Sequence, residues 1–145
     1  MQVILRQARQ GDYQAIGQLI QGELGYNHID REKLYIRLDK ITADDTHRTI
    51  VAEVNGDVAG FIGIHRGLAF NVETEYIQIL AIAVRKALQG KGIGKKLIKW
   101  ADDYAIENNI ERTVLTSRLH RLEAHAFYEG SGFVKKSFGF MKEYK

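Results

Sequence analysis

Three glycines and a lysine lie together in the segment Gln89–Gly94, directly before a stretch with helical periodicity. The first N–H groups of a helix have no acceptor within the helix and carry the positive end of its dipole, so they bind phosphate groups. Side chains at Gly90, Gly92 or Gly94 would hold such a ligand away from these N–H groups. The segment therefore predicts an anion-binding site at the start of a helix.

Basic residues around the glycines favour the same interpretation. Five of them fall within a window of 12 residues: Arg85, Lys86, Lys91, Lys95 and Lys96. A solvated loop and helix face is the alternative explanation, but beside an anion-binding helix terminus these charges would attract an anionic ligand. A P-loop does not fit, because Lys96 stands where Ser or Thr is required. A dinucleotide-binding fingerprint does not fit either, because Lys95 stands at its third glycine.

The elements on either side of the glycines are a strand and a helix. Tyr76–Val84 is rich in β-branched and large apolar residues, as expected for a strand buried on both faces. From Ile93 onward, apolar residues recur at helical spacing and charged residues occupy the other faces. The glycine segment is thus predicted to join the end of a buried strand to the first turn of an amphipathic helix.

The rest of the chain predicts alternating strands and helices. Before the glycines the pattern predicts a strand over Val3–Gln7, helices capped by Asp12 and Asp30, and a hairpin of Thr49–Val54 and Val58–His65 about Asn55 and Gly56. After them it predicts a strand over Arg112–Ser117, a helix over Arg121–Glu129 and a last strand over Phe133–Tyr144. The predicted order is β-α-α-β-β-β-α-β-α-β.

The glycine segment resembles the acetyl-CoA motif of the GNAT N-acetyltransferase superfamily, Gln/Arg-x-x-Gly-x-Gly/Ala, with Gln89, Gly92 and Gly94 at its defining positions. Ala124–Phe133 is similar to a second family motif, Ala-x-x-Phe-Tyr-Glu-x-x-Gly-Phe. Glu23–Tyr26 and Val51–Gly56 also look like common family segments. Two motifs in the family's order are much more specific than either motif alone.

The resemblance implies a single N-acetyltransferase domain over residues 1–145, of the α/β (mixed α+β) class, with a central mixed sheet flanked by helices. In that architecture two neighbouring parallel strands splay, and the pantetheine of the co-substrate acetyl-CoA enters the gap. The residues implied in cofactor binding are Ile82, Ala83, Val84, Gln89, Gly90, Lys91, Gly92, Ile93, Gly94, Lys95 and Phe127.

Acetyl transfer to an amine needs a neutral amine, a polarised carbonyl and a stabilised leaving thiolate. The resemblance implies that Tyr128 is the general acid that protonates the thiolate; packing is its alternative role. Gln78 stands where some relatives carry Glu and would only hold a water. Glu73 and Glu75, at the start of the strand, are the carboxylates nearest to the expected place of a base, and we expect Glu75 to take part in catalysis. Solvated loop residues are the alternative for both.

The expected function is acetyl-CoA-dependent transfer of an acetyl group directly to a primary amine of a small molecule or protein. Glu23, Glu73 and Glu75 would suit a cationic acceptor such as a polyamine, an aminoglycoside or a lysine side chain. The main alternative is a non-catalytic acyl-CoA-binding or regulatory module of the same fold. A nucleotide-phosphate binder is a more remote alternative, and a homodimer remains open.

The amino-acid composition excludes some classes of binding partner and some reaction mechanisms. The 145 residues are 45% hydrophobic and 27% charged, which is ordinary for one soluble domain, and the net charge of +3 gives little reason to expect nucleic acid. No apolar run approaches the roughly 20 residues of a membrane helix. We therefore expect no association with a membrane and a cytoplasmic location. Without cysteine, an acetyl-cysteine intermediate is excluded. His120 and His125 do not share a helical face, so no metal is expected.

Overall fold

The computed structural model describes residues 1–119 and 121–145, which form two compact units, Met1–Val114 and Leu115–Lys145. Each unit is described by itself. The first contains strands β1 (Ile4–Gln7), β2 (His47–Val54), β3 (Asp57–Gly67), β4 (Tyr76–Val84) and β5 (Arg112–Val114). Its helices are α1 (Tyr13–Gly22), α2 (Arg31–Ala43) and α3 (Ile93–Glu107), with short 3-10 helices η1 (Gln10–Asp12) and η2 (Lys86–Leu88). The second unit contains α4 (Leu122–Gly130).

The five strands form one mixed sheet in the order β1-β2-β3-β4-β5. The first four pair antiparallel, and β5 is parallel to β4. The tight turn between β2 and β3 needs positive φ at both central residues, and Asn55 and Gly56 adopt φ of 52° and 85°. The predicted hairpin and the mixed α/β class are therefore confirmed.

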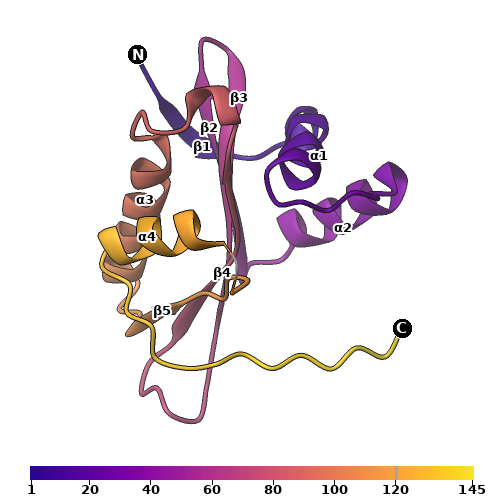
Figure 1. Cartoon of the computed structure of the whole chain (residues 1–145). Helices are drawn as coiled ribbons and strands as arrows, with labels where there is room; N and C mark the ends of the chain where they lie inside the picture. Colours follow the sequence, from indigo (N-terminus) through magenta and orange to yellow (C-terminus); the bar gives the residue numbers. More distant parts are fainter. Residues whose placement is uncertain (120) are drawn as a thin grey trace. The chain divides into compact units, whose positions relative to one another are not determined.

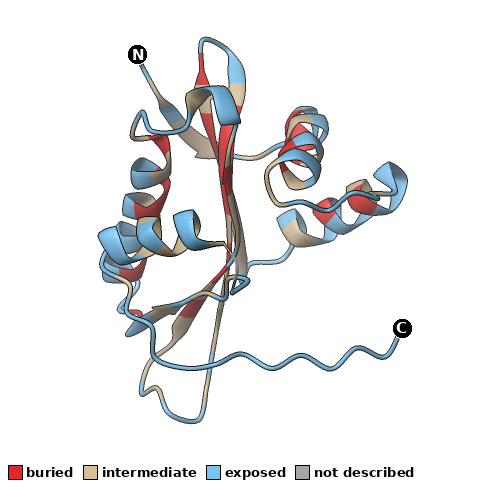
Figure 2. Ribbon diagram, in the orientation of Figure 1, coloured by how far each residue is buried: buried red, intermediate tan, exposed pale blue. Residues whose placement is uncertain are grey.

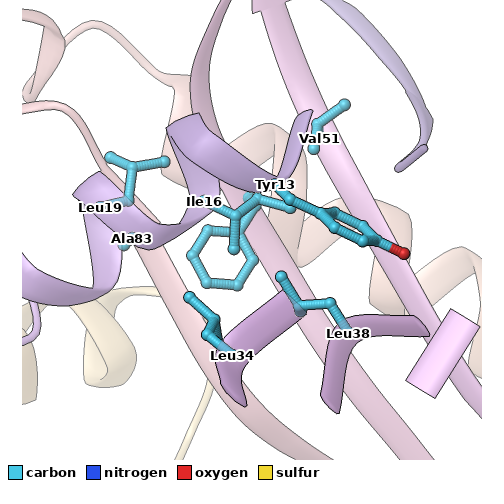
Figure 3. Close-up of a cluster of buried hydrophobic side chains, with 8 residues drawn as sticks. Tyr13, Ile16, Leu19, Leu34, Leu38, Val51 and Ala83 are labelled. Atoms are coloured by element: carbon cyan, nitrogen blue, oxygen red, sulfur yellow. The ribbon is translucent and has the colours of Figure 1, made fainter. Parts of the chain in front are cut away.

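Helices cover both faces of this sheet, with α1 and α2 on one face and α3 on the other (Figure 1). Figure 2 colours residues of both α1 and α3 as buried, and the buried residues of these two helices are apolar. Between α1, α2 and the sheet lies a cluster of Tyr13, Ile16, Leu19, Leu34, Leu38, Val51, Phe61 and Ala83 (Figure 3). The Tyr13 hydroxyl leaves this cluster and donates a hydrogen bond of 2.9 Å to Asp39 of α2.

The predicted helix starts are confirmed, but only one of the two caps works as expected. Asp30 accepts a 3.0 Å hydrogen bond from the backbone N–H of Lys33, which is the expected N-cap contact of α2. Asp12 precedes α1 without capping it. Its carboxylate instead accepts hydrogen bonds from the Arg6 guanidinium and the Arg9 backbone N–H, and so ties β1 to η1. In the described part of the chain no helix is both long and apolar enough to cross a membrane.

Strand β4 carries a bulge, and its pairing with β5 ends early. Gly63 lies opposite Ala81 and Ile64 opposite Ile79, so Leu80 is an extra residue in β4. The parallel pairing with β5 covers only Tyr76–Gln78, opposite Arg112–Val114. From Ile79 to Val84, β4 continues along β3 and has no strand on its other side in the described unit. The pairing of β4 with β5 is thus confined to the first part of β4, and the expected splay of two parallel strands stays a prediction.

The second unit differs from the prediction after α4. That helix ends at Gly130. Gly132 follows with a φ of +94°, and two hydrogen bonds typical of a glycine-terminated helix are present: the Phe133 N–H donates to the Tyr128 carbonyl, and the Gly132 N–H donates to the Glu129 carbonyl. The predicted last strand, Phe133–Tyr144, is wrong, because these residues form neither helix nor strand. The large apolar side chains of this segment are 72% to 96% exposed and do not pack as the inward face of a strand: Val134, Phe138, Phe140, Met141 and Tyr144. The predicted strand Arg112–Ser117 is also shorter and ends at Val114.

Candidate functional site

The unpaired edge of β4 presents backbone groups at residues Ile82 and Val84. The Arg85 N–H donates to the Ala59 carbonyl of β3 at 2.7 Å. Because the direction of N–H and C=O groups alternates along a strand, Ala83 also faces β3, whereas Ile82 and Val84 face the open edge. The structure thus places the N–H groups of two predicted cofactor-binding residues where an extended ligand could accept hydrogen bonds from them.

The glycine segment forms the start of α3, as predicted. Gly90 and Gly92 have φ of +79° and +88°, a region that disfavours residues with a Cβ, and Gly92 is the N-cap of a helix of 15 residues. A Cβ at either glycine would meet no atom within 4 Å. These glycines are therefore required by the backbone conformation, and space for a ligand lies beside them. The N–H groups of the first turn of α3 point out of the helix and lack an acceptor within it.

The five basic residues predicted around this segment lie at the surface and form no ion pair with the described residues: Arg85, Lys86, Lys91, Lys95 and Lys96. Their charges are not neutralised by a protein carboxylate within salt-bridge distance. Together with the positive end of the α3 dipole, they make this end of the unit attractive to a polyanion such as a pyrophosphate.

Gln89 links three elements at this end of the unit. Its side-chain Nε2 donates to the carbonyl oxygen of Val84 at 2.9 Å and to Oε2 of Glu23 at 3.3 Å. Glu23 is the residue that follows α1, 66 positions earlier in the chain. The contact therefore holds the end of α1 beside the open edge of β4. Sequence reasoning named both residues but did not predict that they meet, because no local pattern encodes a contact of such long range.

Glu75, the predicted catalytic carboxylate, lies at the opposite end of β4. Its two oxygens accept hydrogen bonds of 2.6 and 2.9 Å from Arg66, whose guanidinium also donates to the Tyr104 hydroxyl and to Asn108. This contact lowers the pKa of the Glu75 carboxyl, which weakens it as a base. At about 3.3 Å per residue, Glu75 is roughly 25 Å along the strand from Ile82–Val84. The geometry favours a structural role for Glu75 in a network with Arg66 and Tyr104, which the sequence analysis did not identify.

The other residues considered for base catalysis and metal binding are dispersed. Glu73 is exposed at the start of β4, and its backbone N–H donates to Glu111 at 3.0 Å. Gln78 lies opposite His65 in the ladder of β3 and β4, and the His65 ring lies 4.5 Å from that of His47. His120 lies outside the described residues. Among the described residues, no three or more His, Cys, Asp and Glu side chains gather in a group that could hold a metal ion.

Phe127 and Tyr128 lie on α4, in the second unit. The two rings meet edge to face with centroids 5.6 Å apart, and Tyr128 makes a similar contact with Phe133 at 6.1 Å. Burial raises the pKa of Tyr128 above its usual value, so the hydroxyl remains protonated and able to donate at neutral pH. That state is the one a general acid requires before it acts.

Comparison with known proteins places this geometry in a family. The model of the acetyltransferase (GNAT) family matches residues 12–133. The aminoalkylphosphonate N-acetyltransferase of Salmonella typhimurium is 31% identical over 88 residues, which are 61% of this chain and 57% of that protein, so the chain spans little more than half of that relative. A transcriptional regulator from Bacillus halodurans has 27% identity and a TM-score of 0.89, with 99% of this chain and 100% of the other covered. A GNAT family acetyltransferase from Staphylococcus aureus has 25% identity and a TM-score of 0.80, with 99% of each chain covered. Because the family model spans well over half of the sequence, the chain belongs to the GNAT acetyltransferase family, whose general reaction is acetyl transfer to an amine.

Proposed function

We propose that this protein is an acetyl-CoA-dependent N-acetyltransferase that transfers the acetyl group directly to a primary amine. The observation that carries the proposal is the conjunction, at one end of the first unit, of the open β4 edge with the free N–H groups at the start of α3. An extended pantetheine arm suits the strand edge, and a pyrophosphate suits the helix terminus with its basic surroundings. We further propose that residues 1–145 act as one transferase domain.

In this proposal, the backbone of β4 binds and polarises the thioester. The N–H groups of Ile82 and Val84 face the open edge, so one of them can donate to the carbonyl oxygen as negative charge develops there. The N–H groups at Gly92–Lys95 and the nearby lysines hold the phosphates. Gln89 stabilises the end of β4 by its hydrogen bond to the Val84 carbonyl.

Transfer then requires three proton movements. An alkyl ammonium with a pKa near 10.4 must lose its first proton, and Gln78 is proposed to hold the water that passes it to solvent. The neutral amine attacks the carbonyl carbon, the carbon–sulfur bond breaks, and the electron pair leaves with the sulfur. The nitrogen, now bonded to the acetyl group, loses its second proton to solvent and becomes the neutral amide. Tyr128 gives its proton to the thiolate and regains one from solvent. Glu75 is not assigned the role of base, because Arg66 already binds both of its oxygens.

A non-catalytic acyl-CoA-binding module is the second candidate. It has a specific observation in its favour, since a solved relative that matches nearly the whole chain is described as a transcriptional regulator. Such a module would use the same strand edge and helix terminus for binding but would not need the Tyr128 hydroxyl. The two candidates therefore predict the same affinity for acetyl-CoA and a different outcome with an amine.

The deciding experiment measures both properties on the same preparation. Calorimetry gives the affinity for acetyl-CoA, and a thiol reagent with mass spectrometry follows the release of CoA and the acetylated product across a panel of primary amines. Amine-dependent product establishes the transferase. Binding without product for any amine would favour the module, and absence of binding would refute both.

A further inference from the structure

Three carboxylates, Glu23, Glu73 and Glu75, were candidates for recognition of a cationic acceptor, and the structure separates them. Glu75 is neutralised by Arg66, and Glu73 lies near it at the far end of β4, beside Glu111. Glu23 alone of the three lies at the open edge, because its Oε2 and the Val84 carbonyl oxygen are within 3.3 Å of the same Gln89 nitrogen. Of these three carboxylates, only Glu23 lies near the proposed acyl site and could bind a positively charged group of the acceptor there.

The charge of Glu23 is not matched by a protein cation. Its hydrogen-bond donor is the neutral amide of Gln89, and it forms no ion pair with the described residues. By contrast, Asp12 and Glu53, which contact β1 at the opposite edge of the sheet, are both paired with Arg6. A half-buried carboxylate held in place by a neutral donor is suited to bind an incoming cation, because a charge-assisted hydrogen bond is stronger than the contact it replaces.

We propose that Glu23 binds a positively charged group of the acceptor, and that the acceptor is an amine with at least one further cationic group. This inference rests on the proposed transferase function. The second charge is required because the reacting nitrogen must be neutral when it attacks, so it cannot itself be held by Glu23 at that moment. Gln89 acts as a positioning residue that keeps the Glu23 carboxylate beside the end of β4.

The surrounding lysines set a condition on this binding. Lys91, Lys95 and Lys96 would repel a cationic acceptor from the free protein. Phosphates bound at the start of α3 would offset these charges, so Glu23 should select its cation in the presence of CoA. The same arrangement works against acceptors that carry a phosphate or phosphonate beside the amine, because they would face the Glu23 carboxylate.

The test compares Glu23→Gln with Glu107→Gln, an exposed carboxylate at the far end of α3, about 20 Å from its first turn. The cationic probes are spermidine, lysinamide and kanamycin, and the anionic probes are 2-aminoethylphosphonate and glucosamine 6-phosphate. Calorimetry measures the binding of each probe to the protein saturated with CoA, and steady-state assays give KM and kcat for each probe that reacts. CoA affinity, measured separately, reports on the proposed function itself.

We expect at least one cationic probe to bind, and Glu23→Gln to raise its Kd and KM about tenfold while kcat changes little. Glu107→Gln should match the parent, and Glu23→Asp should recover part of the loss. The proposal is overturned if no cationic probe binds the CoA-loaded protein, if an anionic probe is preferred, or if Glu23→Gln weakens both classes equally. A parent that fails to bind CoA would instead refute the proposed function.

Discussion

A negative charge at Gly92 should weaken CoA binding more than tenfold. Gly92 is the N-cap of α3, its φ is +88°, and a side chain there would extend into open space beside the free N–H groups of the first turn. At about 5 Å from a pyrophosphate with two negative charges, an Asp carboxylate in water costs about 0.8 kcal/mol for each charge. The sum of about 1.7 kcal/mol corresponds to roughly 15-fold in Kd.

The backbone contribution is removed by comparison with Gly92→Asn. Asn has nearly the shape of Asp and both tolerate positive φ, so the two variants share the conformational cost of losing glycine. Asp is also a favourable N-cap, so α3 should form in both, which circular dichroism and thermal unfolding can verify. The Kd of each variant for CoA is then measured by calorimetry at low and high salt.

The expected result is a Kd for Gly92→Asp at least tenfold above that for Gly92→Asn at low salt, with a smaller ratio in 1 M salt, where charges are screened beyond about 3 Å. Equal affinities of the two variants would show that no phosphate lies near Gly92. That outcome would refute the assignment of the α3 terminus as the anion site.

Three further predictions follow from the same geometry. Lys91→Ala and Lys95→Ala should each weaken CoA binding a few-fold in a salt-sensitive way, since exposed ion pairs contribute about 0.2–1 kcal/mol, and should leave pantetheine binding unchanged. Equal losses of affinity for both ligands, measured by calorimetry, would argue against a phosphate contact. Tyr128→Phe should retain acetyl-CoA binding and lower turnover tenfold or more, and a variant as fast as the parent would limit Tyr128 to packing. Glu75→Gln should lower the free energy of unfolding by about 1 kcal/mol at neutral pH without changing KM for the acceptor. Because Arg66 lowers the folded-state pKa of Glu75, this contribution to stability is present above the ordinary Glu pKa of about 4.3 and is lost as the pH falls through the folded-state pKa. Denaturant unfolding of the parent and the variant at pH 7 and pH 3 should show this loss. A difference in unfolding free energy between the two proteins that persists at pH 3 would contradict the prediction.

Local signals in the sequence were sufficient for most of the fold. The Asn55-Gly56 turn, the Asp30 cap and the glycine segment before α3 each require a particular residue type at a particular backbone conformation, so they can be recognised without tertiary information. The last strand could not be predicted in the same way. The alternation of Phe138 and Phe140 is a local signal, but a strand also needs a partner edge, and none pairs with these residues.

The site was predictable only where it is local. Residues Gln89–Lys95 are contiguous, so their spacing revealed the loop and helix start. Glu75 illustrates the opposite case: its proximity to the strand suggested catalysis, but its side chain is engaged by Arg66, and that contact depends on the register of β3 with β4. The bulge at Leu80 and the contact of Glu23 with Gln89 likewise arise from the assembled sheet and leave no periodic trace in the sequence.

The early end of the β4–β5 pairing has a consequence for the solubility of the ligand-free protein. From Ile79 to Val84, β4 has no strand partner on one side in the described unit, so N–H groups such as those of Ile82 and Val84 can template the addition of another chain. A ligand that lies along this edge would protect the amides of Ile82 and Val84 from hydrogen exchange and would also block self-association. The ligand-free protein should therefore self-associate more readily than the ligand-bound protein.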